Sequence, residues 1–146
     1  MTRQEACDKL WEVATAELGV HETPGTVATK RIQEYQTYTT YGRRSDEIPW
    51  CSDFANFVVD TAGWKGTRSA AAKSWRDWGV VLEFPIKGCI VILPRNDPNN
   101  VGAAHVTFCN DPDITEGFIS CIGGNQGDAV KVSSYKINGA QYRSPV

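Results

Sequence analysis

The sequence contains little that would hold a metal ion or a disulfide framework. It has two histidines and five cysteines, and no two cysteines have the C-x-x-C spacing of common zinc sites. An odd number of cysteines also leaves at least one thiol unpaired. We therefore expect neither a metal nor a cofactor, and we expect free cysteines, which are typical of a reducing compartment.

Long apolar segments and clusters of basic residues are absent too. No apolar run approaches the ~20 residues of a membrane span, and the net charge of −2 comes without a run of lysine or arginine. An integral membrane segment and nucleic acid binding are therefore not expected. The N-terminal residues 1–5 lead into a mixed amphipathic segment rather than a signal-peptide core. We expect synthesis in a cytoplasm, and another export route for any action outside.

The pattern of apolar residues predicts helices first and strands second. We expect a single domain over residues 1–146. Helical spacing predicts helices over residues 4–18, 27–38, 51–62 and, in a shorter form, 69–78. Strands are predicted over residues 80–84, 88–93, 103–109, 118–123, 129–136 and 140–143. This order predicts an α+β fold in which N-terminal helices pack on a mainly antiparallel sheet of about five or six strands.

One cysteine stands where a thiol is easily ionised. Cys51 follows Pro49 and Trp50 at the first turn of the helix predicted over 51–62. A helix start offers unpaired N–H groups and the positive end of the dipole, and the thiolate is the nucleophilic form of cysteine. Helical spacing places Cys51 on one stripe with Phe54, so the thiol should face the sheet. The alternative is a small buried hydrophobe, the usual role of a free cysteine.

A histidine and an asparagine can be placed near each other by the register of one hairpin. If the strand of His105 and the strand that follows it form a hairpin centred near Thr115, Cys109 lies opposite Cys121 and His105 lies opposite Asn125. Asn125 would then orient the imidazole, although a slip of one residue would reverse the faces. Two alternatives stay open: His105 as an ordinary strand histidine, and Asn125 as a turn residue that tolerates left-handed backbone.

These three residues predict nucleophilic catalysis. Cys51 would attack a carbonyl as a thiolate, and His105 would take its proton and later protonate the leaving amine. Asn125 would fix the tautomer and orientation of the ring. The N–H of Cys51 would provide half of an oxyanion hole, and the second donor stays open between Ser52, Asp53 and a loop N–H.

The order of these residues resembles the papain-like peptidoglycan hydrolases of the CHAP and NlpC type, in particular a small single-domain subfamily of phage endolysins. The chain follows that pattern over most of its length. The resembling segments are residues 17–25, 49–56, 63–67, 69–79, 105–106 and 123–126.

The resemblance implies a papain-like fold and assigns roles by position. Cys51 matches the nucleophile, His105 the base and Asn125 the polar third residue, whereas Gly123 stands where many CHAP domains carry a glutamate. Candidate substrate-binding residues are Glu22, Trp50 and Asp53, with a helix end and core packing as the alternatives for the first two. Asp46 and Glu47 are too few acids for the calcium loop of some CHAP domains.

The resemblance also implies a function. It predicts cleavage of an amide bond in peptidoglycan by an N-acetylmuramoyl-L-alanine amidase or an endopeptidase of phage or prophage origin. Such a monomeric enzyme would be made in the host cytoplasm and would reach the wall after holin-type release. The alternatives are a non-catalytic wall-binding or virion-structural module on the same fold, and a cysteine protease or deamidase toxin that acts on protein.

Overall fold

The computed structural model describes residues 1–23, 29–45, 49–95, 99 and 102–146. Its helices are α1 (Arg3–Ala16), α2 (Lys30–Gln36), α3 (Cys51–Thr61) and the short 3-10 helix η1 (Ala72–Asp77). Its strands are β1 (Val80–Leu82), β2 (Ile90–Pro94), β3 (Ala104–Thr115), β4 (Phe118–Gly123), β5 (Lys131–Lys136) and β6 (Gln141–Ser144). Asp46 and Glu47, which the sequence suggests are too few for a calcium loop, lie outside the described residues.

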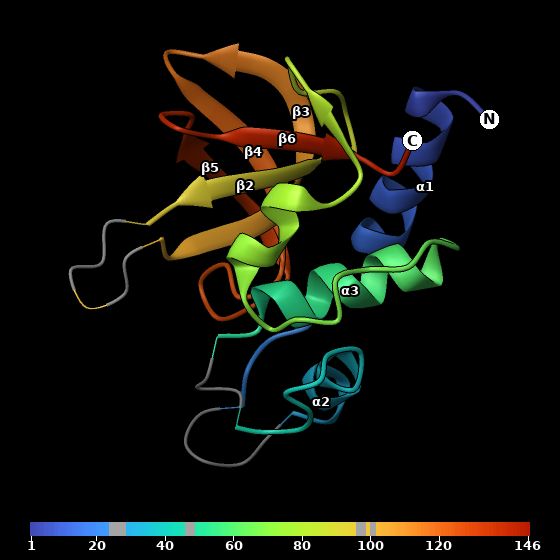
Figure 1. The fold of residues 1–146 in the computed structure, drawn as a ribbon. Helices are drawn as coiled ribbons and strands as arrows, with labels where there is room; N and C mark the ends of the chain where they lie inside the picture. The colour runs from blue at the N-terminus through green and yellow to red at the C-terminus, as the bar shows by residue number, and fades with distance from the viewer. Residues whose placement is uncertain (24–28, 46–48, 96–98, 100–101) are drawn as a thin grey trace.

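The described strands form one six-stranded sheet in the order β1-β6-β2-β3-β4-β5, and all neighbours are antiparallel. The helices lie below and beside this sheet, and α3 lies between the sheet and α2 (Figure 1). The predicted α+β fold with an antiparallel sheet is therefore confirmed. Within the described part of the chain, no helix combines the length and the apolar character that crossing a membrane requires.

The predicted register of the β3–β4 hairpin is confirmed close to the candidate site. Cys109 lies opposite Cys121 and Phe108 lies opposite Ile122. The turn itself falls at residues 116–117, where both backbone φ angles are positive, as a tight hairpin turn requires. Two irregularities between Cys109 and Thr115 shift the strand pairing. Cys109 therefore pairs with Cys121, as predicted for a hairpin centred near Thr115, although the turn itself lies further along the chain.

Strand β3 is longer than the sequence predicts. It continues past Cys109 to Thr115 and includes Pro112. Beyond Phe108 the neighbouring strand β2 has ended, because its first residue Ile90 pairs with Phe108. A proline is tolerated there because the strand has a partner on one side alone and needs fewer N–H donors.

The sheet has a separate apolar core on each face. The helix-side core joins α1, α2 and α3 to one face and includes Leu10, Tyr35, Phe54, Ile92 and Phe108. The sheet-side core covers the other face and consists of Cys7, Leu82, Cys89, Val91, Leu93, Cys109, Ile119, Cys121 and Tyr142. Because side chains alternate along a strand, neighbouring residues of β3 enter different cores.

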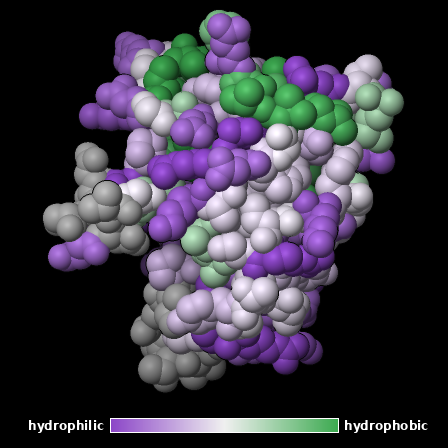
Figure 2. Space-filling view, in the orientation of Figure 1, coloured by the Kyte–Doolittle hydropathy of each residue, from purple (hydrophilic) through white to green (hydrophobic). Residues whose placement is uncertain are grey.

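Exposed apolar side chains gather at one end of the molecule. Figure 2 shows them at the upper edge of the view, whereas the lower part is mainly polar or intermediate. The edge strand β1 and the segment after it contribute exposed side chains, with Val81 64% and Phe84 73% exposed. A monomeric state stays a prediction.

Candidate active site

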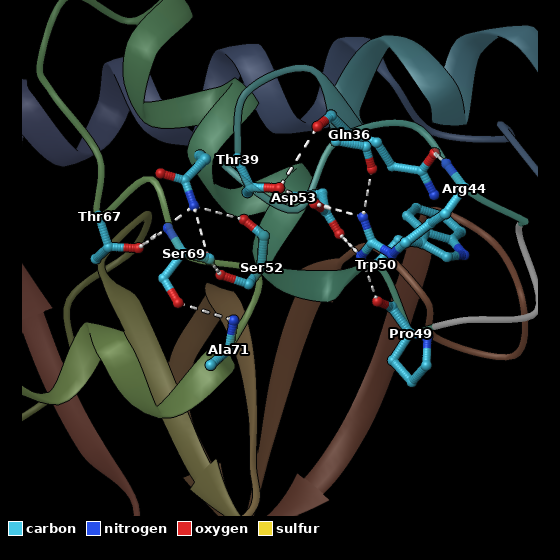
Figure 3. Close-up of polar contacts among 12 residues, drawn as sticks. Gln36, Thr39, Arg44, Pro49, Trp50, Ser52, Asp53, Thr67, Ser69 and Ala71 are labelled. Carbon is cyan, nitrogen blue, oxygen red and sulfur yellow. Dashed lines mark hydrogen bonds and ion pairs between the residues drawn. The ribbon is translucent and has the colours of Figure 1, made fainter.

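A buried ion pair positions the start of α3. The carboxylate of Asp53 pairs with the guanidinium of Arg44 and accepts a hydrogen bond of 2.7 Å from Thr39 Oγ1. Arg44 also donates to the carbonyl oxygen of Pro49 at 2.9 Å. In Figure 3, Arg44 lies between Asp53 and Pro49. The chain that enters α3 is therefore tied to the first turn of that helix.

Cys51 is the first residue of α3, and its thiol lies close to β3, one of the two central strands of the sheet. The side chain is 6% exposed. The backbone N–H groups of Val106 in β3 and of Ser52 act to lower the pKa of this thiol, so both lie close to its sulfur atom. The thiol therefore lies beside the peptide bond that joins His105 to Val106.

The end of β4 explains why the thiol of Cys51 can lie close to Val106. Continuing the register of Cys109 with Cys121 places residue 124 opposite Val106, but β4 ends at Gly123. At Gly124 the chain leaves the ladder and passes against α3, where a Cβ would lie 2.7 Å from atoms of both Trp50 and Phe54. The thiol of Cys51 thus lies close to β3 just beyond the end of β4.

The ring of His105 is held at both nitrogen atoms. Nε2 lies 3.1 Å from Oε1 of Gln126, and Nδ1 lies 3.1 Å from Nη2 of Arg95. Because a guanidinium can only donate, Nδ1 is the acceptor and the ring proton is assigned to Nε2. The histidine is 2% exposed. Its lone pair is therefore occupied by Arg95.

Gln126 is fixed by its own hydrogen bonds. Its Nε2 donates to the carbonyl oxygens of Cys121 at 3.2 Å and of Lys131 at 2.7 Å. These two acceptors assign the other amide atom as oxygen, which faces His105 and also lies 2.6 Å from Thr107 Oγ1. A side chain held in this way gives the imidazole one orientation.

The glycine at position 123 leaves the space that this amide occupies. A Cβ on Gly123 would lie 2.5 Å from Oγ1 of Thr107 and 2.8 Å from Oε1 of Gln126. Both distances are shorter than ordinary van der Waals contacts. A larger residue at position 123 would therefore displace Gln126 from the histidine.

Burial keeps both reactive groups neutral. Desolvation raises the pKa of the Cys51 thiol, against the opposing effects of the Val106 N–H and the positive charge of Arg95. Desolvation also lowers the pKa of His105 to about 4, an effect that the bond to Gln126 opposes and the charge of Arg95 reinforces. Burial therefore leaves both the thiol and the imidazole neutral rather than ionised.

A cleft of about 250 Å³ opens beside Cys51. Five alanines and Pro49 form most of its described wall. The charged residues among its described lining are Lys73 and Arg95, both cationic. The cleft can therefore admit a small group to the sulfur atom and offers positive charge to that group.

The structure places Asn125 differently from the sequence-based register. Its backbone φ is 58°, in the left-handed region, so β4 cannot continue to it as a strand. The described residues include no hydrogen bond between Asn125 and His105, and the neighbouring Gln126 contacts the ring instead. The alternative interpretation of Asn125 as a turn residue agrees with this backbone conformation.

The three candidate substrate-binding residues do not line the described cleft. Asp53 is 0% exposed and its carboxylate is taken up by Arg44 and Thr39. Trp50 is also 0% exposed, and its Nε1 donates to Glu22 at 2.9 Å. The contacts of Asp53 and Trp50 hold the start of α3, and a substrate-binding role for them stays a prediction. Glu22 contacts Trp50 rather than the described cleft.

Sequence reasoning missed Arg95, Gln126 and Lys73. Gln126 follows directly after the candidate Asn125, and the preceding pair of glycines was the available signal that the strand ends early. Arg95 comes one residue after β2, at the position that pairs with Ala103 just before β3. No local pattern marks Lys73.

Among the described residues, no group of three or more His, Cys, Asp or Glu side chains could hold a metal ion, and all five cysteines are free. Comparison with known proteins gives no match: no family model, no curated protein and no solved structure is significantly similar to this chain.

Proposed function

We propose that the protein is a cysteine hydrolase that cleaves an amide bond of bacterial peptidoglycan. The observation that carries the hydrolase proposal is the arrangement of Cys51, His105 and Gln126. A cleft-facing thiol at a helix start lies close to the peptide after His105, and a fixed amide orients that histidine. These are the parts of a nucleophile, a base and an orienting residue.

In the proposed reaction Cys51 is the nucleophile and His105 is the base. Nε2 carries the ring proton toward Gln126, so Nδ1 receives the thiol proton as sulfur attacks the carbonyl carbon. The N–H of Cys51, at the start of α3, stabilises the resulting oxyanion. The C–N bond then breaks, and Nδ1 returns the proton to the leaving amine. Water hydrolyses the thioester with His105 again as base, and the thiol is restored.

The substrate class and the setting come from the sequence resemblance to CHAP and NlpC hydrolases of papain-like fold. On that basis we propose a phage or prophage endolysin that is made in the host cytoplasm and acts on the wall after holin-type release. The amidase and endopeptidase activities stay alternatives to each other. Gln126 takes the orienting role, and the glycine at position 123 provides its space.

The test compares Cys51→Ala with Cys7→Ala on purified peptidoglycan. Cys7 is a buried thiol of the sheet-side core and serves as the matched control. Released amino groups are measured, and mass spectrometry of the fragments identifies the cleaved bond. We expect wild-type protein and Cys7→Ala to release amino groups and folded Cys51→Ala to release none.

Three other results would contradict the proposal in different ways. Full activity of a folded Cys51→Ala variant would remove the nucleophile. Binding of wild-type protein to the wall without new amino groups would favour a non-catalytic module. Cleavage of protein substrates but not of wall peptides that contain D-amino acids would favour a protease or deamidase.

A further inference from the structure

His105, the base of the proposed reaction, is blocked in this structure by the side chain of Arg95. The one ring nitrogen of His105 that can accept a proton is Nδ1, and Nη2 of Arg95 donates to it at 3.1 Å. The described residues include no hydrogen bond from the thiol of Cys51 to the ring. Proton transfer from sulfur to Nδ1 therefore requires Arg95 to leave this position.

Arg95 lines the cleft in addition to contacting His105. It lines the cleft together with Cys51 and Lys73, and the residue as a whole is exposed. Its flexible side chain can therefore turn toward a ligand in the cleft. The described lining contains no carboxylate that would neutralise the two cations.

We propose that Arg95 and Lys73 form a carboxylate-binding subsite and that a carboxylate of the substrate draws Arg95 away from His105, which frees Nδ1 as the base. A guanidinium binds a carboxylate through two parallel charge-assisted hydrogen bonds, which outcompete its single bond to a neutral imidazole. This inference rests on the proposed hydrolase function. It assigns the substrate class as peptides with a free carboxylate close to the scissile amide.

The positive charge of Arg95 has a second effect on the site. It opposes protonation of His105 while it stays on the ring. Movement of Arg95 to a carboxylate removes the donor from Nδ1 and neutralises that charge. Both changes raise the proton affinity of His105 at the moment when a substrate is bound. Hydrolysis of substrates without the carboxylate would be slow for the same reason.

The test uses two alkylating reagents of nearly equal size. Iodoacetate carries a carboxylate and iodoacetamide does not. With either reagent the sulfur of Cys51 forms a bond to the CH₂ carbon, the C–I bond breaks, and the thiol proton passes through Nδ1 to solvent. Rates are measured by mass spectrometry of the Cys51 peptide and divided by the rates for a small free thiol.

We expect the normalised ratio of iodoacetate to iodoacetamide rates to be about tenfold above one in the wild-type protein. Arg95→Gln should bring the ratio close to one, and Lys73→Gln should lower it by a smaller factor. Lys9→Gln, which removes an exposed cation of α1, should leave it unchanged. Equal ratios in wild-type protein and Arg95→Gln, or no alkylation of Cys51 by either reagent, would overturn the inference.

A spectroscopic measurement separates the effect on His105 from a merely structural role of Arg95. Acetate is titrated at constant ionic strength while the ¹⁵N resonance of His105 Nδ1 is recorded. The resonance should move in wild-type protein and should stay fixed in Arg95→Gln. The pKa of His105 should also be higher in Arg95→Gln than in wild-type protein, because a nearby cation has been removed. An unchanged resonance in wild-type protein would contradict the release of the base.

Wall hydrolysis measured on the same samples separates the two proposals. Selective alkylation that depends on Arg95, without wall hydrolysis, would retain the subsite and reject the hydrolase. Hydrolysis without that selectivity would retain the hydrolase and reject the subsite.

Discussion

Cys51 and Cys121 are both buried thiols, but their surroundings differ. Cys121 is 0% exposed, belongs to the sheet-side core and lies opposite Cys109. Cys51 is 6% exposed, borders a cleft and lies close to backbone N–H groups and to the charge of Arg95. Burial raises the pKa of both thiols, and at Cys51 the N–H of Val106 and the charge of Arg95 oppose it. The comparison shows that access and polar partners, rather than burial, distinguish the candidate nucleophile.

The largest expected effect concerns His105, the proposed base for Cys51. His105→Ala should lower wall hydrolysis by about 10³-fold, within the range that a positioned base supplies. His21→Ala provides the control, because His21 is exposed. Initial rates of amino-group release measure both variants. Equal losses in the two variants would show that His105 has no special role.

The next effect concerns the ion pair that holds the start of α3. Arg44→Met should lower the free energy of unfolding by about 3–5 kcal/mol, because it leaves a buried carboxylate unpaired. The side chains of Arg44 and Asp53 are 6% and 0% exposed. Arg31→Met is the matched control, since Arg31 is 40% exposed in its pair with Glu17 and such pairs contribute about 0–1 kcal/mol.

Urea denaturation gives both free energies of unfolding. A loss below 1 kcal/mol in Arg44→Met would contradict this role of the ion pair. This ion pair holds the start of α3, which carries Cys51, whereas Cys121 lies in the sheet-side core. Arg44→Met should therefore change the alkylation rate of Cys51 more than that of Cys121.

The pH dependence of stability offers a third test. Burial lowers the pKa of His105 from 6.5 to about 4, so the unfolded chain binds this proton more readily than the folded one. Stability from this group is therefore fully present above about pH 6.5 and is lost as the pH falls toward 4. The expected loss is about 3 kcal/mol. His105→Gln should show a smaller decrease over this window, and an unchanged pH profile would contradict the buried neutral imidazole.

A smaller effect distinguishes two adjacent residues. Gln126→Ala should lower wall hydrolysis by about 10- to 100-fold, part of what the oriented base contributes. Asn125→Ala should lower it by no more than about threefold, because the structure places no contact to the histidine there. Circular dichroism checks that both variants fold. A larger loss in Asn125→Ala than in Gln126→Ala would restore the orienting role that the sequence assigns to Asn125.

The smallest effect sharpens the comparison of the thiols. Cys121→Ala should leave wall hydrolysis unchanged and should lower the free energy of unfolding by about 1 kcal/mol, the cost of a small cavity in a packed core. Urea denaturation and the amino-group assay measure the two quantities. A loss of hydrolysis without a loss of stability would place Cys121 in the reaction.

The sequence predicts the parts of this molecule that follow from repeating patterns. Helical spacing places Cys51 at the start of α3, and strand alternation places His105 on the face shared with Cys109. The hairpin register is confirmed at Cys109 and Cys121 because apolar faces restrict slippage. These features depend on neighbours close in the sequence or on a single hairpin.

The remaining features of the site depend on where a strand or helix ends, which the repeating patterns do not predict. The register predicted from the sequence continues the β3–β4 ladder to Asn125, but β4 ends at Gly123 and the chain turns, so Gln126 reaches the histidine. Arg95 approaches from the end of β2, a strand distant in sequence from Cys51. Trp50 and Asp53 lie at the start of α3, and the direction in which their side chains point depends on how α3 packs. Such placements require the tertiary structure.

The most direct test of the central claim is a titration of Cys51 with iodoacetamide followed by the amino-group assay on peptidoglycan. Mass spectrometry gives the modified fraction of each cysteine in every sample. The account predicts that Cys51 is modified before the four thiols of the sheet-side core and that hydrolysis falls in proportion to the modified fraction of Cys51. Full hydrolysis by protein in which Cys51 is completely alkylated would contradict the account.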